Sequence, residues 1–118
     1  MTEITTEQLA EFELLIGGET SPAASGSTYD STDPFTGKPW ARVPDGGAAD
    51  VDRAVAAARA ALNGPWGALT PTARGKLLWR LGEIIAREAE NLAELEVRDG
   101  GKLTREMVGQ MRALPDYY

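Results

Sequence analysis

The sequence predicts an α+β fold, in which a small antiparallel β-hairpin is followed by about four helices. Turn-forming residues separate two short segments of strand character near residue 35. Apolar residues recur at helical spacing from Gly46 onward, and glycine or proline marks the places where that pattern stops. At 118 residues the chain has the usual size of one domain, so a single hydrophobic core is expected.

The hairpin is predicted from Thr28–Ser31 and Trp40–Val43, which flank the turn sequence Asp33–Gly37. Proline and glycine at this spacing suit a compact turn. Simple alternation along the returning strand would place Trp40 and Ala41 on opposite faces. A two-stranded ribbon of this length is marginal on its own, so it needs another surface to lie against.

The residues before the hairpin carry weaker signals. Residues 1–13 are predicted to be a flexible segment, in which one or two helical turns over Thr5–Phe12 are expected to fray. Leu14–Ile16 is predicted to be a brief strand, because the glycine pair that follows it permits a reversal of the chain. Thr20–Ser27 is expected to be a polar loop.

Two longer helices are predicted next. The first has acidic residues in its opening turn, where they suit the positive end of the helix dipole, and it stops at Asn63-Gly64-Pro65. Thr70 is the predicted cap of the second helix, with Pro71 in its first position. Each has an apolar face at helical spacing, formed by Val51, Val55, Ala58 and Leu62 in the first and by Leu77, Leu78, Leu81, Ile84 and Ile85 in the second.

Two shorter helices complete the prediction. Asn91 is expected to interrupt the second helix and cap a third, which stops at Gly100-Gly101. Thr104 is the predicted cap of the fourth. That helix still accumulates apolar residues near Tyr117-Tyr118, so the natural chain is expected to continue. The alternative is that the two tyrosines pack back as an anchor.

The three tryptophans, Trp40, Trp66 and Trp79, are hard to bury together in a hairpin and four short helices. Burial of one large aromatic side chain is worth roughly 2–3 kcal/mol. We therefore expect them to need a partner surface. The alternative is that two of the three join a core formed by this chain alone.

Composition excludes several kinds of function within this chain. Cysteine and histidine are both absent, which excludes thiolate nucleophiles, catalytic triads and imidazole metal ligands. The net charge is −6 and basic residues are interleaved with acidic ones, which argues against nucleic acid as a partner. No apolar stretch approaches the roughly 20 residues that cross a bilayer, and Met1–Glu13 is acidic rather than basic. A cytoplasmic protein without a membrane partner is expected.

Neither of the common phosphate-binding glycine patterns is present, so a dinucleotide site made wholly by these residues is not expected. Asp99 is the carboxylate of most interest, because it precedes Gly100-Gly101 at a helix end where free carbonyls can hold a cation or a lysine. Its alternative is a solvated residue near a helix cap. Asp30 and Asp33 are expected to stabilise the turn rather than bind calcium.

The order of several sequence blocks resembles the opening of NAD(P)-dependent aldehyde dehydrogenases. The resemblance covers about Leu14 to Tyr118, and the blocks stand in the order typical of that family. They are Leu15–Glu19, Asp33–Gly37, Ala41–Gly46, Asp50–Ala61, Gly64–Trp66, Leu69–Leu81 and Glu96–Lys102. The resemblance implies that residues 14–118 are the amino-terminal, incomplete part of a cofactor-binding domain within the family's α/β fold.

The resemblance also implies an enzyme that oxidises an aldehyde to a carboxylic acid with NAD or NADP. The family's cysteine nucleophile, its water-activating glutamate and its principal cofactor contacts match positions beyond Tyr118, so no catalytic or cofactor-binding residue is assigned here, and this chain alone is expected neither to turn over substrate nor to bind the cofactor. Its partners would be the remainder of the parent enzyme and the aldehyde, in a homodimer or homotetramer. The alternative is an autonomous helical module that binds another protein without catalysis.

Two positions are carried over from the family as metal ligands. Thr32, through its carbonyl, and Asp99 match places that in some members contribute to a monovalent cation site. The segment Met111–Leu114 matches residues that line the substrate funnel.

Overall fold

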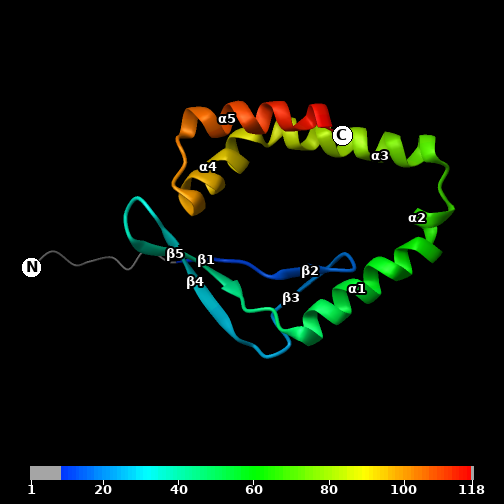
Figure 1. Cartoon of the computed structure of the whole chain (residues 1–118), viewed down its shortest axis with the longest axis horizontal. Coiled ribbons are helices and arrows are strands. Elements are labelled where there is room, and N and C mark those ends of the chain that lie inside the picture. The colour runs from blue at the N-terminus through cyan, green and yellow to red at the C-terminus, as the bar shows by residue number, and fades with distance from the viewer. Residues whose placement is uncertain (1–8, 118) are drawn as a thin grey trace, which may run out of the picture.

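The computed structural model describes residues 9–117, and Figure 1 shows them as an open arc rather than a ball. The strands lie along one side, α1 climbs away from them, and the remaining helices run back along the opposite side. The radius of gyration is 18.0 Å, whereas a compact chain of this length has about 13–14 Å. The chain therefore does not close around a core of its own.

The strands form two small sheets. Strands β1 (Ala10–Glu11), β5 (Lys38–Pro44) and β4 (Thr28–Asp33) make a three-stranded sheet in the order β1-β5-β4. Strands β2 (Leu14–Ile16) and β3 (Glu19–Ser21) form a separate antiparallel pair. The predicted hairpin is thus confirmed as the antiparallel pair of β4 and β5.

Two predictions about the first residues are corrected. A helical turn reaching Phe12 is wrong for the described residues, because Ala10–Glu11 pair with β5 as a parallel strand; residues 1–8, the rest of the predicted flexible segment, lie outside the description. The polar loop begins later than predicted, because Glu19–Ser21 return as β3 after the glycine turn.

A β-bulge in the hairpin decides where Trp40 lies. Ser31 pairs with Ala41 while Thr32 pairs with Pro39, so Trp40 is an extra residue in β5 without a partner of its own. Such a bulge bends the strand and re-aims a side chain. Trp40 and Ala41 are consequently both buried and line the same groove, and the prediction that they lie on opposite faces is wrong.

The four predicted helices are present with two boundaries shifted, and two single turns, α2 and η1, are additional. Thr70 caps its helix as expected, its hydroxyl oxygen accepting from the Ala73 amide at 3.2 Å. The next break comes at Glu88 rather than Asn91, whose side chain instead donates to the Glu88 carboxylate. Leu103, not Thr104, is the last cap. The helices are α1 (Ala48–Asn63), the single turn α2 (Pro65–Ala68), α3 (Pro71–Arg87), α4 (Ala89–Gly100), α5 (Thr104–Ala113) and a final 3₁₀ turn, η1 (Leu114–Tyr117).

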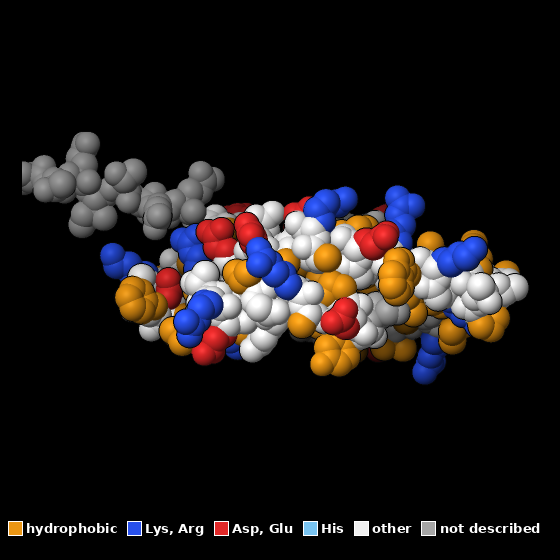
Figure 2. All heavy atoms as spheres, turned by 90° about the horizontal axis from the view of Figure 1, so that it is seen from above, with side chains coloured by type: hydrophobic (Ala, Val, Ile, Leu, Met, Phe, Trp, Pro, Cys, Tyr) orange, Lys and Arg blue, Asp and Glu red, His pale blue; other side chains and the backbone are white. Residues whose placement is uncertain are grey.

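The buried apolar core is small. Most of it consists of alanines, and its members are Ala23, Trp40, Ala41, Ala89, Ala93 and Met107. Val51, Val55 and Leu62, on the apolar face predicted for α1, are exposed, as are several leucines of α3. Figure 2 shows hydrophobic side chains scattered over the surface seen from above. Large apolar areas are therefore left without a cover.

The tryptophans follow the first of the two expectations. Trp40 is buried, whereas Trp66 is partly exposed and Trp79 is 69% exposed. A core formed by this chain alone thus takes one tryptophan, not two. Tyr117 is 84% exposed and does not anchor the helices, and Tyr118 lies outside the described residues. Within residues 9–117, no helix has the length and apolar character needed to cross a membrane.

One buried carboxylate joins the start of α1 to the loop after β3. Asp50 is 4% exposed and accepts from the Gly47 amide at 3.0 Å and from the Ala24 amide at 3.0 Å, while Arg53 donates to it at 2.8 Å. The Gly47 hydrogen bond, supported by those from Ala24 and Arg53, holds the pKa of Asp50 below its usual 3.8, although burial opposes this by favouring the neutral acid.

Because its pKa is lowered by folding, the ionised Asp50 stabilises this junction above about pH 4, and the stabilisation is lost as the pH falls through the folded-state pKa. Relative to the intrinsic exchange rate at each pH, we expect the Ala24 and Gly47 amides to be better protected from hydrogen exchange above that range than below it. In Asp50→Ala this protection should be low at every pH, without the acid transition. Amide exchange in the intact protein checks this, with the exposed Asp52→Ala as the matched control. An unchanged acid transition in Asp50→Ala would contradict the assignment.

Candidate functional site

The carboxyl end of α4 meets β4 at a defined junction. The Ser31 hydroxyl donates to the Asp99 carboxylate at 2.5 Å, across 68 residues of sequence. Gly101 ends α4 with a φ of +66°, and its amide donates to the Val97 carbonyl. A Cβ on Gly101 would lie 3.1 Å from the Pro34 Cβ, so the helix end is in close contact with the β4–β5 turn. The junction therefore depends on a residue without a side chain.

The two predicted cation ligands are located at this junction. Asp99 is held through Ser31, the neighbour of Thr32 in β4. Thr32 pairs with Pro39, which has no amide hydrogen, so the Thr32 carbonyl receives no ladder hydrogen bond from that partner. Within the described part of the chain, no three acidic side chains gather as metal ligands. Thr32 and Asp99 stay a prediction.

The neighbouring aspartates behave as the sequence indicates. Asp33 accepts from the Phe35 amide at 2.7 Å and from the Thr36 amide at 3.3 Å, which stabilises the turn. Asp30 forms an ion pair with Arg42 on the adjacent strand at 3.0 Å. Both carboxylates are therefore engaged in local structure.

An open, mainly apolar groove of about 540 Å³ lies between the sheet and the helices, and we call it the sheet–helix groove. Phe12 and Trp40 meet there edge to face with ring centroids 6.0 Å apart, and the Arg98 guanidinium lies 5.4 Å from the Trp40 ring centre. Residues of β4, β5, α3, α4, α5 and η1 complete it. The lining consists of Phe12, Ser31, Trp40, Ala41, Val43, Ile85, Leu92, Leu95, Glu96, Asp99, Met111 and Leu114.

Two of the residues predicted to line a substrate funnel, Met111 and Leu114, line the sheet–helix groove. Nothing in this chain tests the path of a substrate, so the funnel assignment of Met111–Leu114 stays a prediction. The apolar spacing of the helices is the sequence signal for the groove itself. The contribution of Phe12 has no such signal, because its amide donates to the Arg42 carbonyl, thirty residues away in the sequence.

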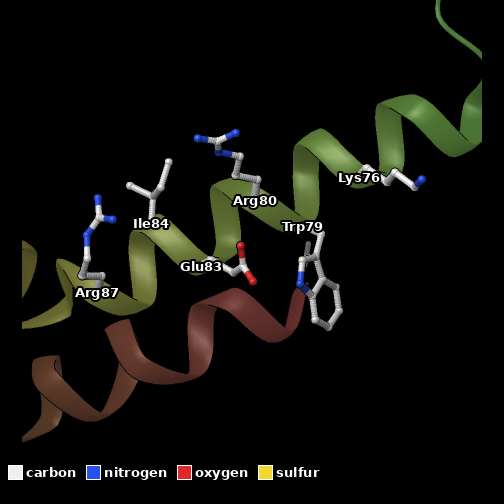
Figure 3. A pocket seen from close by; sticks show the side chains of 6 residues that line it. All are labelled: Lys76, Trp79, Arg80, Glu83, Ile84 and Arg87. Carbon is white, nitrogen blue, oxygen red and sulfur yellow. The ribbon is translucent and has the colours of Figure 1, made fainter.

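A second hollow, of about 610 Å³, runs beside α3 (Figure 3). Its six lining residues all come from that one helix: Lys76, Trp79, Arg80, Glu83, Ile84 and Arg87. In Figure 3 their side chains fan out along the helix in different directions instead of converging on one point. A reaction centre needs groups that converge, so this hollow has no such arrangement.

A dinucleotide phosphate does not fit the helix end that most resembles a phosphate site. Strand β5 leads through Gly46-Gly47 into α1, and free amides at such a helix start can bind an anion. Here the Asp50 carboxylate already accepts from the Gly47 amide and from Ala24. A phosphate would have to displace a buried negative charge. The sequence also lacks the cysteine and histidine of the common nucleophile–base pairs.

Substitution of Gly101 tests the junction between α4 and β4. A non-glycine residue at this φ costs about 1–2 kcal/mol, and the new methyl would also press on Pro34. We expect Gly101→Ala to speed amide exchange at the end of α4 by roughly tenfold, measured in the intact protein. Gly100→Ala is the matched control, because its Cβ would meet only the flexible Lys102 side chain at 3.7 Å. Equal effects of the two changes would show that the junction does not depend on Gly101.

Comparison with known proteins places this geometry among enzymes of one kind. A sequence model described as the aldehyde dehydrogenase family matches residues 21–118. A dehydrogenase of Acinetobacter baylyi, named for (Z)-2-((N-methylformamido)methylene)-5-hydroxybutyrolactone, is 38% identical over 111 residues, which are 93% of this chain and 22% of that protein. An aldehyde dehydrogenase of Aspergillus niger is 41% identical, over 84% of this chain and 21% of that protein.

Solved structures agree with the sequence comparison. The NAD-dependent aldehyde dehydrogenase of Sinorhizobium meliloti is 32% identical, with a TM-score of 0.87 over 92% of this chain and 22% of that one. Betaine aldehyde dehydrogenase of Staphylococcus aureus, solved with NAD+, is 31% identical, with a TM-score of 0.82 over 91% of this chain and 22% of that one. The chain thus spans about a fifth of the length of the proteins that it matches.

Proposed function

Because the chain belongs to the aldehyde dehydrogenase family, we propose that it is the amino-terminal portion of an enzyme that oxidises an aldehyde to a carboxylic acid with NAD or NADP. The observation that carries the proposal is the match of residues 21–118 to the family, together with structural agreement at a TM-score of 0.87. Several neighbours are NAD-dependent by name or were solved with NAD+.

The role of this chain in that enzyme is to supply a scaffold. It lacks cysteine and histidine, and some of its charged groups pair locally, as Asp30 does with Arg42 and Lys102 with Glu96. The reactive thiol, the water-activating carboxylate and the oxyanion donors of the reaction are therefore proposed to come from the remainder of the enzyme. What this chain provides is apolar surface, on α1, on α3 and in the sheet–helix groove, for that remainder to pack against.

The cofactor is likewise proposed to be held by the remainder. The residues present here do not fit a dinucleotide at the start of α1, because Asp50 already accepts from the Gly47 amide there and from the Ala24 amide of the loop after β3. The autonomous interaction module is the weaker reading, since a module that works alone needs a closed core. The radius of gyration of 18.0 Å and the exposed apolar helix faces indicate that the described residues do not form a closed core.

Thr32 and Asp99 are proposed to contribute to a monovalent cation site in the complete enzyme. The support is local: the two residues belong to the junction formed by the Ser31–Asp99 hydrogen bond, and the Thr32 carbonyl lacks a donor on Pro39. Carbonyl and carboxylate oxygens are suitable ligands for such a hard ion. Thr32 would act through its backbone, so its side chain is not needed.

Assembly into a homodimer or homotetramer and a cytoplasmic location complete the proposal. The support for assembly is the amount of exposed apolar surface, part of which can be buried between subunits. The acidic composition, with a net charge of −6, suits a protein that keeps free of nucleic acid and anionic membrane surfaces. Sedimentation of the complete enzyme and fractionation of the cells that make it test these two points.

Activity should require the remainder of the enzyme. We expect the purified 118-residue chain to reduce neither NAD nor NADP when an aldehyde is added, because it has no cysteine thiol to attack the carbonyl. The complete polypeptide should reduce one of them, which the absorbance of the reduced nicotinamide reports directly. Turnover by the chain alone would contradict the assignment of the nucleophile, and an inactive complete enzyme across a panel of aldehydes would contradict the proposed reaction.

Loss of the Asp99 carboxylate should alter cation dependence. In the complete enzyme, we expect Asp99→Ala to raise the potassium or sodium concentration needed for half-maximal activity by about tenfold, because the cation loses a negatively charged ligand. Thr32→Val should leave it unchanged, because the proposed ligand is a backbone carbonyl. Activity titrations in each salt check this. Identical titrations for Asp99→Ala and the unmodified enzyme would remove Asp99 from the site.

A further inference from the structure

The indole N–H of Trp40 is buried without an acceptor. Trp40 is 7% exposed and lines the sheet–helix groove, and its Nε1 atom has no hydrogen-bond partner within the described residues. A buried donor left unpaired loses its hydration and gains nothing in return, so native proteins rarely keep one. We therefore look for an acceptor of the Trp40 Nε1 hydrogen outside the described residues.

A second polar group, the Arg98 guanidinium, lies beside the indole and has no ion-pair partner among the described residues. The Arg98 guanidinium lies over the Trp40 ring, and Arg98 makes none of the ion pairs found among residues 9–117. The other polar residues of the lining are already engaged, since Asp99 accepts from Ser31 and Glu96 pairs with Lys102. The groove thus has an apolar floor and one buried donor without an acceptor, and beside that donor lies a guanidinium that makes no ion pair within the described residues.

We propose that one segment of the remainder of the parent enzyme enters the sheet–helix groove, fills it with apolar side chains and places an oxygen within hydrogen-bond distance of Trp40 Nε1. The oxygen is a backbone carbonyl or a side-chain carboxylate, and a carboxylate would serve Arg98 as well. This inference rests on the proposed function, because it takes the remainder as the occupant. The groove volume of about 540 Å³ accommodates several apolar side chains.

We favour the remainder of the parent enzyme over a second copy of the chain as the occupant, because a segment of the same polypeptide has the higher effective concentration at the groove. The curated relatives extend over more than four times the length covered here, since this chain spans 22% of the first of them. A segment of the same polypeptide is present at a high effective concentration, so it takes the groove before a separate molecule can. The apolar faces of α1 and α3, which are exposed in the same chain, need cover from the same source.

The oxygen can reach Nε1 because the side chains that cover Trp40 are themselves at the surface. Phe12 is 42% exposed and directly follows the two-residue strand β1, and Arg98 is exposed on α4. Either side chain can change rotamer when a segment enters the groove. Ala41, which is fully buried beside Trp40, stays as the floor.

Nuclear magnetic resonance of the indole N–H groups tests this in the complete enzyme. Ligation of residues 1–118, labelled with ¹⁵N at tryptophan, to an unlabelled remainder leaves only Trp40, Trp66 and Trp79 visible. Trp40→Phe assigns one signal, and should that variant fail to fold, Trp66→Phe and Trp79→Phe assign it by elimination. Exposed Trp79 is the matched control, because it lies outside the groove.

In the ligated enzyme, we expect the Trp40 indole proton to resonate downfield of that of Trp79 and to exchange with solvent at least roughly tenfold more slowly, the factor given by one hydrogen bond of ordinary net strength. An unshifted Trp40 signal in an active enzyme overturns the inference and leaves the proposed function intact. A downfield shift already present in the 118-residue chain also overturns it: if the shift depends on concentration, a second copy is the occupant, and if not, the acceptor is water or the chain itself. Failure of the proposed function shows separately, as absence of aldehyde oxidation.

Discussion

Burial of apolar helix faces is the requirement on which the rest of this structure depends. The sequence builds amphipathic helices with regular apolar spacing, yet α1 and α3 leave much of that surface exposed. At about 25 cal/mol per Å² of apolar surface, such faces are the main source of stability that a helix can offer. Within the described residues, much of the apolar surface of α1 and α3 is not buried and so contributes little stability. The open arc, the small alanine-rich core and the exposed Trp79 are three consequences of the same shortage of partners.

The elements that local chemistry decides could be predicted from the sequence. Thr70-Pro71 starts α3 and Gly101 ends α4, because a capping hydroxyl and a positive φ are properties of single residues. Pairing between distant segments could not be predicted in this way. The parallel contact of β1 with β5 and the bulge that leaves Trp40 unpaired both depend on registers that no single stretch of sequence encodes.

The candidate site shows the same division. Asp99 could be found because a carboxylate before two glycines marks the end of a helix, but its partner Ser31 is 68 residues away and has no distinguishing signal. The acidic residues at the start of α1 were expected to suit the helix dipole, whereas the hydrogen bond from Ala24 to Asp50 required the folded loop. Family resemblance supplied the reaction, which the residues of this chain alone do not contain.

Heat absorption on unfolding tests most directly whether these residues need a larger body. A self-sufficient domain of 118 residues would unfold in one transition that absorbs about 80 kcal/mol near 60 °C. Calorimetry of the isolated chain should instead show no cooperative transition approaching that heat. Its apolar helix faces are already exposed to water, so unfolding breaks few packing contacts. A single sharp peak of that size from the monomeric chain would contradict the account.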